Sequence, residues 1–314
     1  MKKIQVALYD RKGYMPCLVG YLCKKGRGIL EARLFTSLEM LTECAEAGNI
    51  DVLLAGEEVA EEIHGLDGKI SKIMLLSEGN QVKEGCGYYL LFKYQPAQDI
   101  VKEVLEQIAE DDNIVYTKAF ASKRSIGFIG VYAPFGGSGV TEYAVSLAGK
   151  LSEKGKVLYI SLEQFHSLDF LQEKKKDASS YRGMSEVVFY LKQRKEKLAL
   201  KLETVVTSWS GADYIFAVED YRDLYSLSSE DVHQFLDVLS GQTDYETVIF
   251  DIGFLSEAAL ALMENCSVLY MPHAKTKQQK SKEAAFWRLL ERGNHGRLSE
   301  SFQRIEGDGV GYDR

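Results

Sequence analysis

The sequence lacks long apolar runs and any excess of positive charge. No stretch approaches the roughly 18 to 20 consecutive apolar residues of a membrane-spanning helix. The first residues, MKKIQVALYDRKG, contain no long apolar segment followed by a small-residue cleavage site, so we expect an unprocessed, cytoplasmic protein. The formal net charge is −8. This balance argues against a protein whose main work is to neutralise nucleic-acid phosphates, so we expect no specific nucleic-acid partner.

Metal-binding and nucleophilic patterns are also missing. The five cysteines include no C-x-x-C pair, and the five histidines show no metal-ligand spacing. The patterns G-x-S-x-G and H-E-x-x-H do not occur. These absences disfavour a disulfide framework and a zinc site. We expect no metal except magnesium carried in with a nucleotide.

The chain contains enough hydrophobic residues to form two hydrophobic cores. Hydrophobic residues make up 46% and charged residues 27% of the 314 residues, as in ordinary soluble globular proteins. The chain is about twice as long as a common single domain, which predicts two domains. The polar run EDDNIVYTKAFASKR separates them. We therefore expect a first domain over 1–112, a linker over 113–124 and a second domain over 125–314.

The first hundred residues alternate apolar runs with amphipathic stretches. This alternation predicts a doubly wound α/β domain with a parallel sheet, because each crossover must bury its own apolar stripe. The predicted strands are 4–9, 32–35, 51–55, 72–76 and 88–92. The predicted helices are 17–25, 37–47, 57–62, a weak one at 78–84, and 97–110.

These five β/α units resemble the receiver (flavodoxin-like) domain of bacterial response regulators. The resemblance implies an acidic site at the strand ends, but Asp10 is the only carboxylate directly after the first strand. Ala55 and Gly56 stand where the phosphoacceptor aspartate is expected. Ser77 and Lys93 match the family's hydroxyl and lysine positions. We expect a pseudo-receiver that serves as an interaction module, with Asp10, Ser77 and Lys93 as remnants.

The second half opens with a strand, SIGFIGVYA, a glycine-rich turn and an amphipathic helix, followed by another strand, KVLYIS. A turn of this kind aims successive backbone N–H groups and a helix N-terminus at one point, which suits a phosphate group. The predicted nucleotide-binding residues are Phe135, Gly136, Gly137, Ser138, Gly139, Val140, Thr141 and Glu142.

This segment resembles the deviant Walker A loop, K-G-G-x-G-K-[ST], of the MinD and ParA ATPases. The three glycines and Thr141 match in place. Pro134 replaces a common glycine, Phe135 replaces the signature lysine and Val140 replaces the phosphate-loop lysine. The resemblance, which covers about 125–305, implies a P-loop NTPase domain with a mostly parallel sheet. It also implies a degenerate site that binds ATP and magnesium weakly or not at all.

Two acidic positions follow in the family's order. Glu163 comes after the second strand, where these ATPases have an aspartate-rich motif. Asp251, at the end of TVIFDIG, matches the Walker B-like position, so any Mg²⁺ would be held with the nucleotide through Thr141 and Asp251; a helix cap is an equal alternative for Asp251. Losing the loop lysine is expected to weaken binding roughly ten- to 150-fold. We expect no catalytic residue and no turnover, because both lysines are missing.

A receiver-like domain fused to a MinD-like domain resembles the TadZ and CpaE proteins of type IVb (Flp/Tad) pilus and secretion systems. That resemblance implies a homodimeric localisation or assembly scaffold, with pilus or secretion proteins as partners and only indirect membrane contact. It implies recruitment to a cell pole or to the inner face of the membrane. Two alternatives stay open: a slow ATPase acting as a nucleotide-gated dimerisation switch, and a receiver-type signalling protein.

Three charged segments resemble polyanion contacts. We expect 173–177 and 192–197 to be solvated helix faces, since acidic residues interrupt them. The most basic segment, KTKQQKSK at 275–282, opens a predicted helix. We expect the apolar residues of that helix to face the sheet; they are Phe286, Trp287, Leu289 and Leu290.

Overall fold

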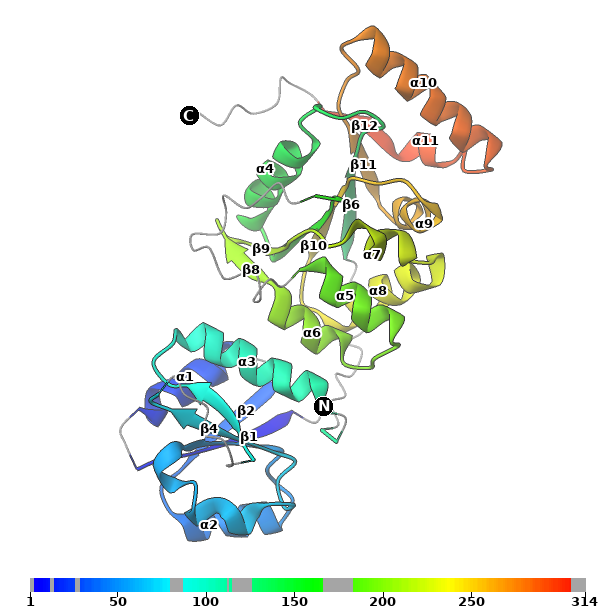
Figure 1. Cartoon of the computed structure of the whole chain (residues 1–314). Coiled ribbons are helices and arrows are strands. Elements are labelled where there is room, and N and C mark those ends of the chain that lie inside the picture. Colours follow the sequence, from blue (N-terminus) through cyan, green and yellow to red (C-terminus); the bar gives the residue numbers. More distant parts are fainter. Residues whose placement is uncertain are drawn as a thin grey trace. The chain divides into compact units, whose positions relative to one another are not determined.

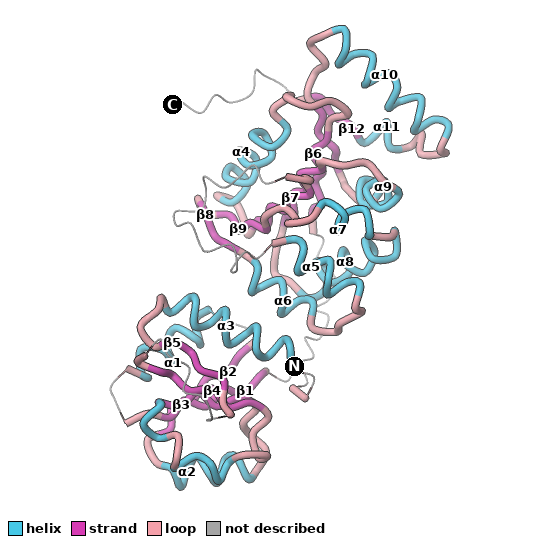
Figure 2. Tube along the Cα trace, viewed as in Figure 1, coloured by secondary structure: helices cyan, strands magenta, loops and turns pink. Residues whose placement is uncertain are grey.

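The structure, a computed structural model, describes residues 3–11, 14–25, 29–79, 87–111, 113–114, 126–165 and 183–305. The chain divides into two compact units, Met1–Ala119 and Phe120–Arg314, each with its own sheet (Figures 1 and 2). The predicted α/β class with mostly parallel sheets is confirmed. No helix within these ranges is both long and apolar enough to cross a bilayer.

The first unit contains a five-stranded parallel sheet in the order β2-β1-β3-β4-β5. Its strands are β1 (Ile4–Tyr9), β2 (Leu30–Phe35), β3 (Val52–Gly56), β4 (Lys72–Ser77) and β5 (Tyr89–Phe92). Its helices are α1 (Met15–Lys25), α2 (Leu38–Glu46), the 3₁₀ turns η1 (Glu57–Val59) and η2 (Glu62–Leu66), and α3 (Ala97–Glu110).

Burial explains this arrangement. Every residue of β3 is buried, as expected for a central parallel strand covered on both faces. The helix α3 buries Ile100, Val104 and Ile108, which recur at helical spacing on one face. Figure 1 shows α1 and α3 on one side of the sheet and α2 on the other.

Two helices predicted in this unit, 57–62 and 78–84, are not seen as α-helices in the described residues. The helix predicted over 57–62 is instead two short 3₁₀ turns, η1 and η2. Val59, Ile63 and Leu66 of these turns pack into the core. The weak helix predicted at 78–84 falls mostly outside the described residues, and residues 78 and 79 are not helical. Of the predicted linker, residues 113 and 114 are described.

The second unit has a seven-stranded sheet in the order β12-β11-β6-β10-β7-β9-β8, in which the β8–β9 pair is antiparallel. Its strands are β6 (Gly127–Tyr132), β7 (Val157–Leu162), β8 (Thr207–Trp209), β9 (Ala212–Ile215), β10 (Thr247–Ile252), β11 (Val268–Met271) and β12 (Phe302–Arg304). Its helices are α4 (Val140–Ser152), α5 (Met184–Lys192), α6 (Leu198–Val205), α7 (Tyr221–Ser226), α8 (Ser229–Gln242), α9 (Glu257–Glu264), α10 (Lys277–Arg292) and α11 (Leu298–Ser301).

The helices of this unit cover both faces of the sheet. Ala144, Val145 and Ala148 of α4 pack with strand residues in one core cluster. Figure 1 shows α4 on one side of the central strands and α8 and α9 on the other. The connection after β6 therefore leaves toward one face, and the connection after the neighbouring strand β10 leaves toward the other.

Candidate functional site

Each of the two sheets has a point at which neighbouring strands send their connections to opposite faces. In open α/β sheets, ligands bind outside the carboxyl ends of the strands at such a switch point. In the second unit this point lies between β6 and β10, whose residues pair in register from Gly127–Thr247 to Tyr132–Ile252. The glycine-rich loop follows β6 and Asp251 lies near the end of β10, so the topology brings these two predicted features together.

The loop has the backbone shape of an anion cradle. Gly137 and Gly139 have φ values of 64° and 76°, in the left-handed region that favours glycine. Gly139 is also the N-cap of α4, and it has no side chain to cap the helix. The Ser138 hydroxyl donates to the Phe135 carbonyl at 3.2 Å, which closes the turn internally. The first N–H groups of α4 are thus left for an external acceptor.

Phe135 and Val140, which replace lysines of the family pattern, pack as apolar side chains instead. The Phe135 side chain is buried. Val140, the first residue of α4, is half-buried and packs against the core cluster under that helix. Between Pro134 and Glu142 the sequence has no lysine or arginine. The cradle therefore has a helix N-terminus but no side-chain cation of its own.

Asp251 is held by hydroxyl groups. Only 1% of this residue is exposed, and the Tyr159 hydroxyl donates to its Oδ2 at 2.7 Å. Thr141, in the first turn of α4, lies near enough to lower the pKa of this carboxyl group. Burial and then the nearby Glu163 carboxylate raise the pKa of Asp251 to about 7, against the opposing effect of these two hydroxyls. The carboxyl group is therefore close to half-protonated at neutral pH.

Glu163 lies at this site because the backbone at the end of β7 contacts the backbone directly after β10. A Cβ on Gly253 would lie 2.9 Å from the Glu163 Cα, and the Gly253 N–H donates to the Leu162 carbonyl at 3.1 Å. Glu142 is exposed in the first turn of α4, and its Oε2 lies 3.9 Å from the position of a Cβ on Gly139. Its charge also raises the pKa of Asp251. Two further carboxylates thus act on Asp251 at the cradle.

The site fits magnesium better than it fits a triphosphate. Hydroxyl and carboxylate oxygens such as those of Thr141 and Asp251 are the ligands that Mg²⁺ prefers. Among the described residues, however, no three His, Cys, Asp or Glu side chains are grouped to hold a metal by themselves. Phosphate oxygens bound here would be repelled by the carboxylates of Glu142 and Glu163, whose charges both act on Asp251. The backbone accepts an anion, whereas the side chains oppose one.

Tyr159 is the residue of this site that the sequence analysis missed. Its ring is fully buried in β7, and burial followed by the neighbouring Asp251 raises the pKa of its hydroxyl well above 10. A tyrosine inside an otherwise apolar strand is a usable signal, since a buried tyrosine hydroxyl usually finds a partner. The sequence does not identify that partner, because Asp251 lies 92 positions away.

The three residues predicted as receiver remnants lie together at the equivalent edge of the first unit. The Lys93 Nζ lies 3.2 Å from Asp10 Oδ2, and these side chains are 3% and 0% exposed. Ser77 is buried and donates to Glu57 Oε2 at 2.7 Å. Glu78 Oε1 lies 3.6 Å from the same lysine. The structure therefore brings Asp10, Ser77 and Lys93 to one edge of the sheet.

Gly56 shows why this edge has no acceptor side chain. A Cβ at this position would lie 2.8 Å from Asp10 Oδ1 and 2.8 Å from Glu58 Oε2. The carboxylate of Asp10 thus occupies the space into which a side chain at position 56 would extend. Glu57 and Glu58 were missed as site residues because the segment that contains them was predicted as an ordinary amphipathic helix.

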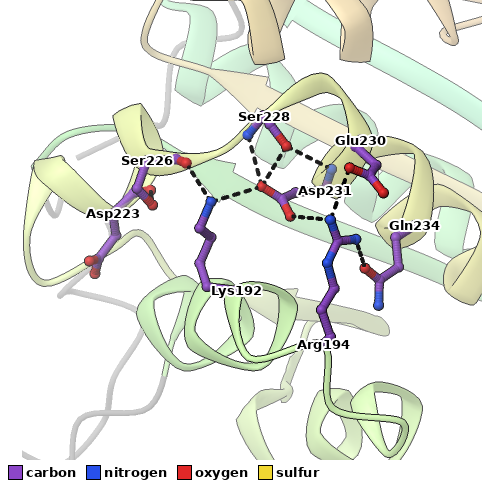
Figure 3. Close-up of polar contacts among 8 residues, drawn as sticks. All are labelled: Lys192, Arg194, Asp223, Ser226, Ser228, Glu230, Asp231 and Gln234. Carbon is purple, nitrogen blue, oxygen red and sulfur yellow. Dashed lines mark hydrogen bonds and ion pairs between the residues drawn. The ribbon is translucent and has the colours of Figure 1, made fainter.

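Lys192 and Arg194, two cations of segment 192–197, make contacts within the second unit. Lys192 donates to the Ser226 carbonyl at 2.9 Å and to Asp231 Oδ2 at 3.1 Å, while Arg194 donates to Gln234 at 2.8 Å (Figure 3). Asp231 is buried and completes a capping box with Ser228 at the start of α8. These two cations thus tie the end of α5 to the start of α8. The segment 173–177 lies outside the described residues.

The apolar residues of α10 only partly follow the prediction. Phe286 and Leu290 are buried, and Phe286 packs against Tyr132 with ring centroids 5.1 Å apart. Trp287 is half-buried, whereas Leu289 is 45% exposed. The prediction for Leu289 is wrong, because the helix contacts its unit along one narrow face.

Comparison with known proteins gives partial structural similarities. No protein-family model and no curated protein match the chain. Among solved structures, a ParA family ATPase from Chlorobium tepidum is 15% identical with a TM-score of 0.47, over 60% of this chain and 78% of that one. A plasmid partition protein from Borrelia burgdorferi is 15% identical with a TM-score of 0.43, over 58% and 77%. An ATP complex of McdA from Cyanothece is 18% identical with a TM-score of 0.38, over 55% and 66%. Similarity at this level assigns neither a family nor a function to the chain.

Proposed function

We propose that this protein is a TadZ/CpaE-like localisation or assembly scaffold for a type IVb (Flp/Tad) pilus or secretion system. In this proposal a pseudo-receiver domain, about 1–112, precedes a MinD/ParA-like domain, about 125–314. The scaffold is a cytoplasmic homodimer that its partner proteins recruit to a cell pole or to the inner face of the membrane. Its nucleotide site binds ATP and Mg²⁺ weakly or not at all.

One observation supports the degenerate site above all others. The glycine cradle keeps its left-handed backbone at Gly137 and Gly139, while the position of the signature lysine is a buried phenylalanine, Phe135. Carboxylates lie around the cradle, and burial followed by the nearby Glu163 raises the pKa of Asp251. An ATPase needs preorganised cations where charge develops on the transferred phosphoryl group. This site offers the opposite charge.

Titration calorimetry with Mg-ATP and Mg-ADP, combined with light scattering on the same samples, tests the proposal. We expect no saturable binding below about millimolar nucleotide and a mass that does not change with nucleotide. Micromolar binding accompanied by a change from monomer to dimer would support the switch described next instead.

The second candidate function is a slow, nucleotide-gated dimerisation switch of the ParA type. The placement of Thr141 close enough to Asp251 to lower its pKa favours this function, because these are the two side chains that would hold Mg²⁺ beside a nucleotide. Steady ATP hydrolysis that is abolished by Asp251→Ala, but not by the distant Asp213→Ala, would establish this function and overturn the first.

The receiver-type alternative has less support. An acyl phosphate needs an acceptor carboxylate at the end of β3, where the sequence has Ala55 and Gly56. Incubation with acetyl phosphate, followed by mass spectrometry, is expected to leave the first unit unmodified. A phosphoaspartate at Asp10 or Asp51 would revive a signalling role.

A further inference from the structure

The helix α10 is attached to its unit along a narrow face. Phe286 and Leu290 are its buried residues, and Glu283 is directed inward, where it pairs with Arg304 and accepts a hydrogen bond from the Trp287 indole at 3.2 Å. Figure 1 shows α10 at the periphery of the unit, beyond β11 and β12. The rest of this 16-residue helix is available for contacts.

The outward side of α10 is a basic stripe, which we define as Lys277, Ser281, Arg288 and Arg292. These residues are all exposed and recur at helical spacing, four, seven and four positions apart, so they lie on one side of the helix. Lys280 and Lys282 are exposed beside the stripe. At 1.5 Å of rise per residue, the stripe is roughly 22 Å long.

These cations are not used inside the protein. Among the residues that the structure describes, no carboxylate forms a salt bridge with Lys277, Lys280, Lys282, Arg288 or Arg292. The exposed Glu291 is the single acidic residue on the outward half of the helix. The lysines at 192 and 201, by contrast, each pair with a carboxylate.

Their position in the helix also argues against a structural role. The first turn of α10 has no acidic residue and includes Lys277 and Lys280. A helix N-terminus carries a partial positive charge, so cations there destabilise the helix slightly. The capping box between Thr276 and Gln279 starts the helix without them. A cost of this kind is offset when an external anion binds the lysines.

We propose that the basic stripe of α10 binds the surface of an anionic lipid membrane. Clusters of four to eight lysines and arginines on a helix are typical of segments that bind acidic lipid headgroups. A planar surface can contact a straight stripe along its whole length. Leu289, 45% exposed beside Arg288, gains by entering the headgroup region, whereas a nucleic-acid backbone offers it no apolar contact. A membrane therefore explains both the cations and the exposed leucine.

The inference goes beyond the proposed scaffold, because it concerns direct lipid contact by the chain itself and requires neither a nucleotide nor a protein partner. Each cation at such a surface contributes roughly a fivefold factor in affinity at low salt. Screening by added salt reduces that contribution.

Vesicle flotation with the full chain tests the inference. The probes are vesicles of phosphatidylglycerol and phosphatidylethanolamine in equal amounts, and vesicles of phosphatidylcholine alone. We expect binding to the first kind only, and a loss of roughly 30-fold in Lys277→Gln/Arg288→Gln. The matched control is Lys150→Gln/Lys154→Gln, which removes two exposed cations of the same unit away from α10. This control is expected to bind as the unmodified chain does.

A second variant separates lipid from nucleic acid. Leu289→Ser is expected to weaken vesicle binding without changing the circular dichroism spectrum. The inference is overturned if the chain fails to bind anionic vesicles at 50 mM salt, or if both double variants lose binding equally. It is also overturned if the stripe variant loses binding to double-stranded DNA while vesicle binding is absent in every variant.

Discussion

The carboxyl edges of the two sheets bury a carboxylate in different ways. In the first unit, Asp10 is neutralised by the buried Lys93 at 3.2 Å. In the second, Asp251 accepts a hydrogen bond from Tyr159, and burial together with the carboxylates of Glu163 and Glu142 raises its pKa to about 7. The two edges thus differ in what surrounds the buried carboxylate: a lysine lies beside Asp10, whereas a further carboxylate, Glu163, raises the pKa of Asp251.

Replacing Lys93, the buried cation at the edge of the first sheet, is expected to have the largest effect on stability. Lys93→Met leaves the buried Asp10 carboxylate without its partner and is expected to lower the free energy of unfolding of the first unit by about 3 to 5 kcal/mol. Both tryptophans, Trp209 and Trp287, belong to the second unit. Urea unfolding followed by circular dichroism should therefore change, while the tryptophan fluorescence transition stays in place.

The matched control for this variant removes both charges. Asp10→Asn/Lys93→Met is expected to recover a large part of the lost stability, because the buried charge of Asp10 is removed together with the lysine. Equal destabilisation by the single and the double variant would show that the ion pair is not what Lys93 contributes.

At the second edge, the prediction concerns pH. The pKa of Asp251 is about 7 in the folded chain and near 4 when unfolded, so the folded state binds the proton more tightly. The stabilisation from this proton is complete below about pH 4 and is lost as the pH rises through about 7. Relative to Asp251→Asn, the unmodified chain should lose on the order of 2 kcal/mol between pH 5 and pH 8.

The measurement is the tryptophan-detected urea transition of both proteins at these two pH values. Asp213→Asn is a suitable control in the same unit, because Asp213 accepts hydrogen bonds from Ser208 and Tyr245, far along the sheet from Asp251. Parallel pH profiles for the unmodified chain and Asp251→Asn would contradict the raised pKa.

Gly56→Ala tests how tightly the carboxylates at the edge of the first sheet are packed. The added methyl group meets Asp10 Oδ1 and Glu58 Oε2 at 2.8 Å, and overpacking of this kind costs about 1 to 3 kcal/mol. Gly65→Ala, where a Cβ meets nothing within 4 Å, is the control. If Gly56→Ala is no more destabilising than Gly65→Ala in the circular dichroism transition, then Asp10 does not fill the acceptor space.

The smallest expected effect comes from Tyr159→Phe, which removes one of the hydroxyls that hold Asp251. The loss of a buried hydrogen bond to a carboxyl group is expected to cost about 1 to 2 kcal/mol. The pKa of Asp251 should rise further, since this hydroxyl favours the charged form. Tyr214→Phe, in the neighbouring strand β9 and in ring contact with Tyr159, is the control. A Tyr159→Phe chain whose stability has the same pH dependence as the unmodified chain would argue against the contact.

Local features of this fold could be predicted from the sequence, and long-range contacts could not. Strands such as 4–9 and 72–76 are mostly apolar runs, and β1 and β4 follow them closely. The glycine cradle could be predicted because its pattern spans eight consecutive residues. The Tyr159–Asp251 bond and the space that Asp10 takes beside Gly56 depend on the register between strands distant in sequence. Leu289 was misassigned because the helical pattern does not say how wide the contact face is.

The most direct test of the central account is to return a cation to the cradle. We expect calorimetric titration with Mg-ATP to give no saturable binding below about millimolar for the unmodified chain. Val140→Lys is expected to bind at least tenfold more tightly, because a charged hydrogen bond is worth about 1.5 to 3 kcal/mol, and Val140→Met, of similar length without charge, to behave as the unmodified chain. Micromolar binding by the unmodified chain, unchanged by the added lysine, would contradict the account.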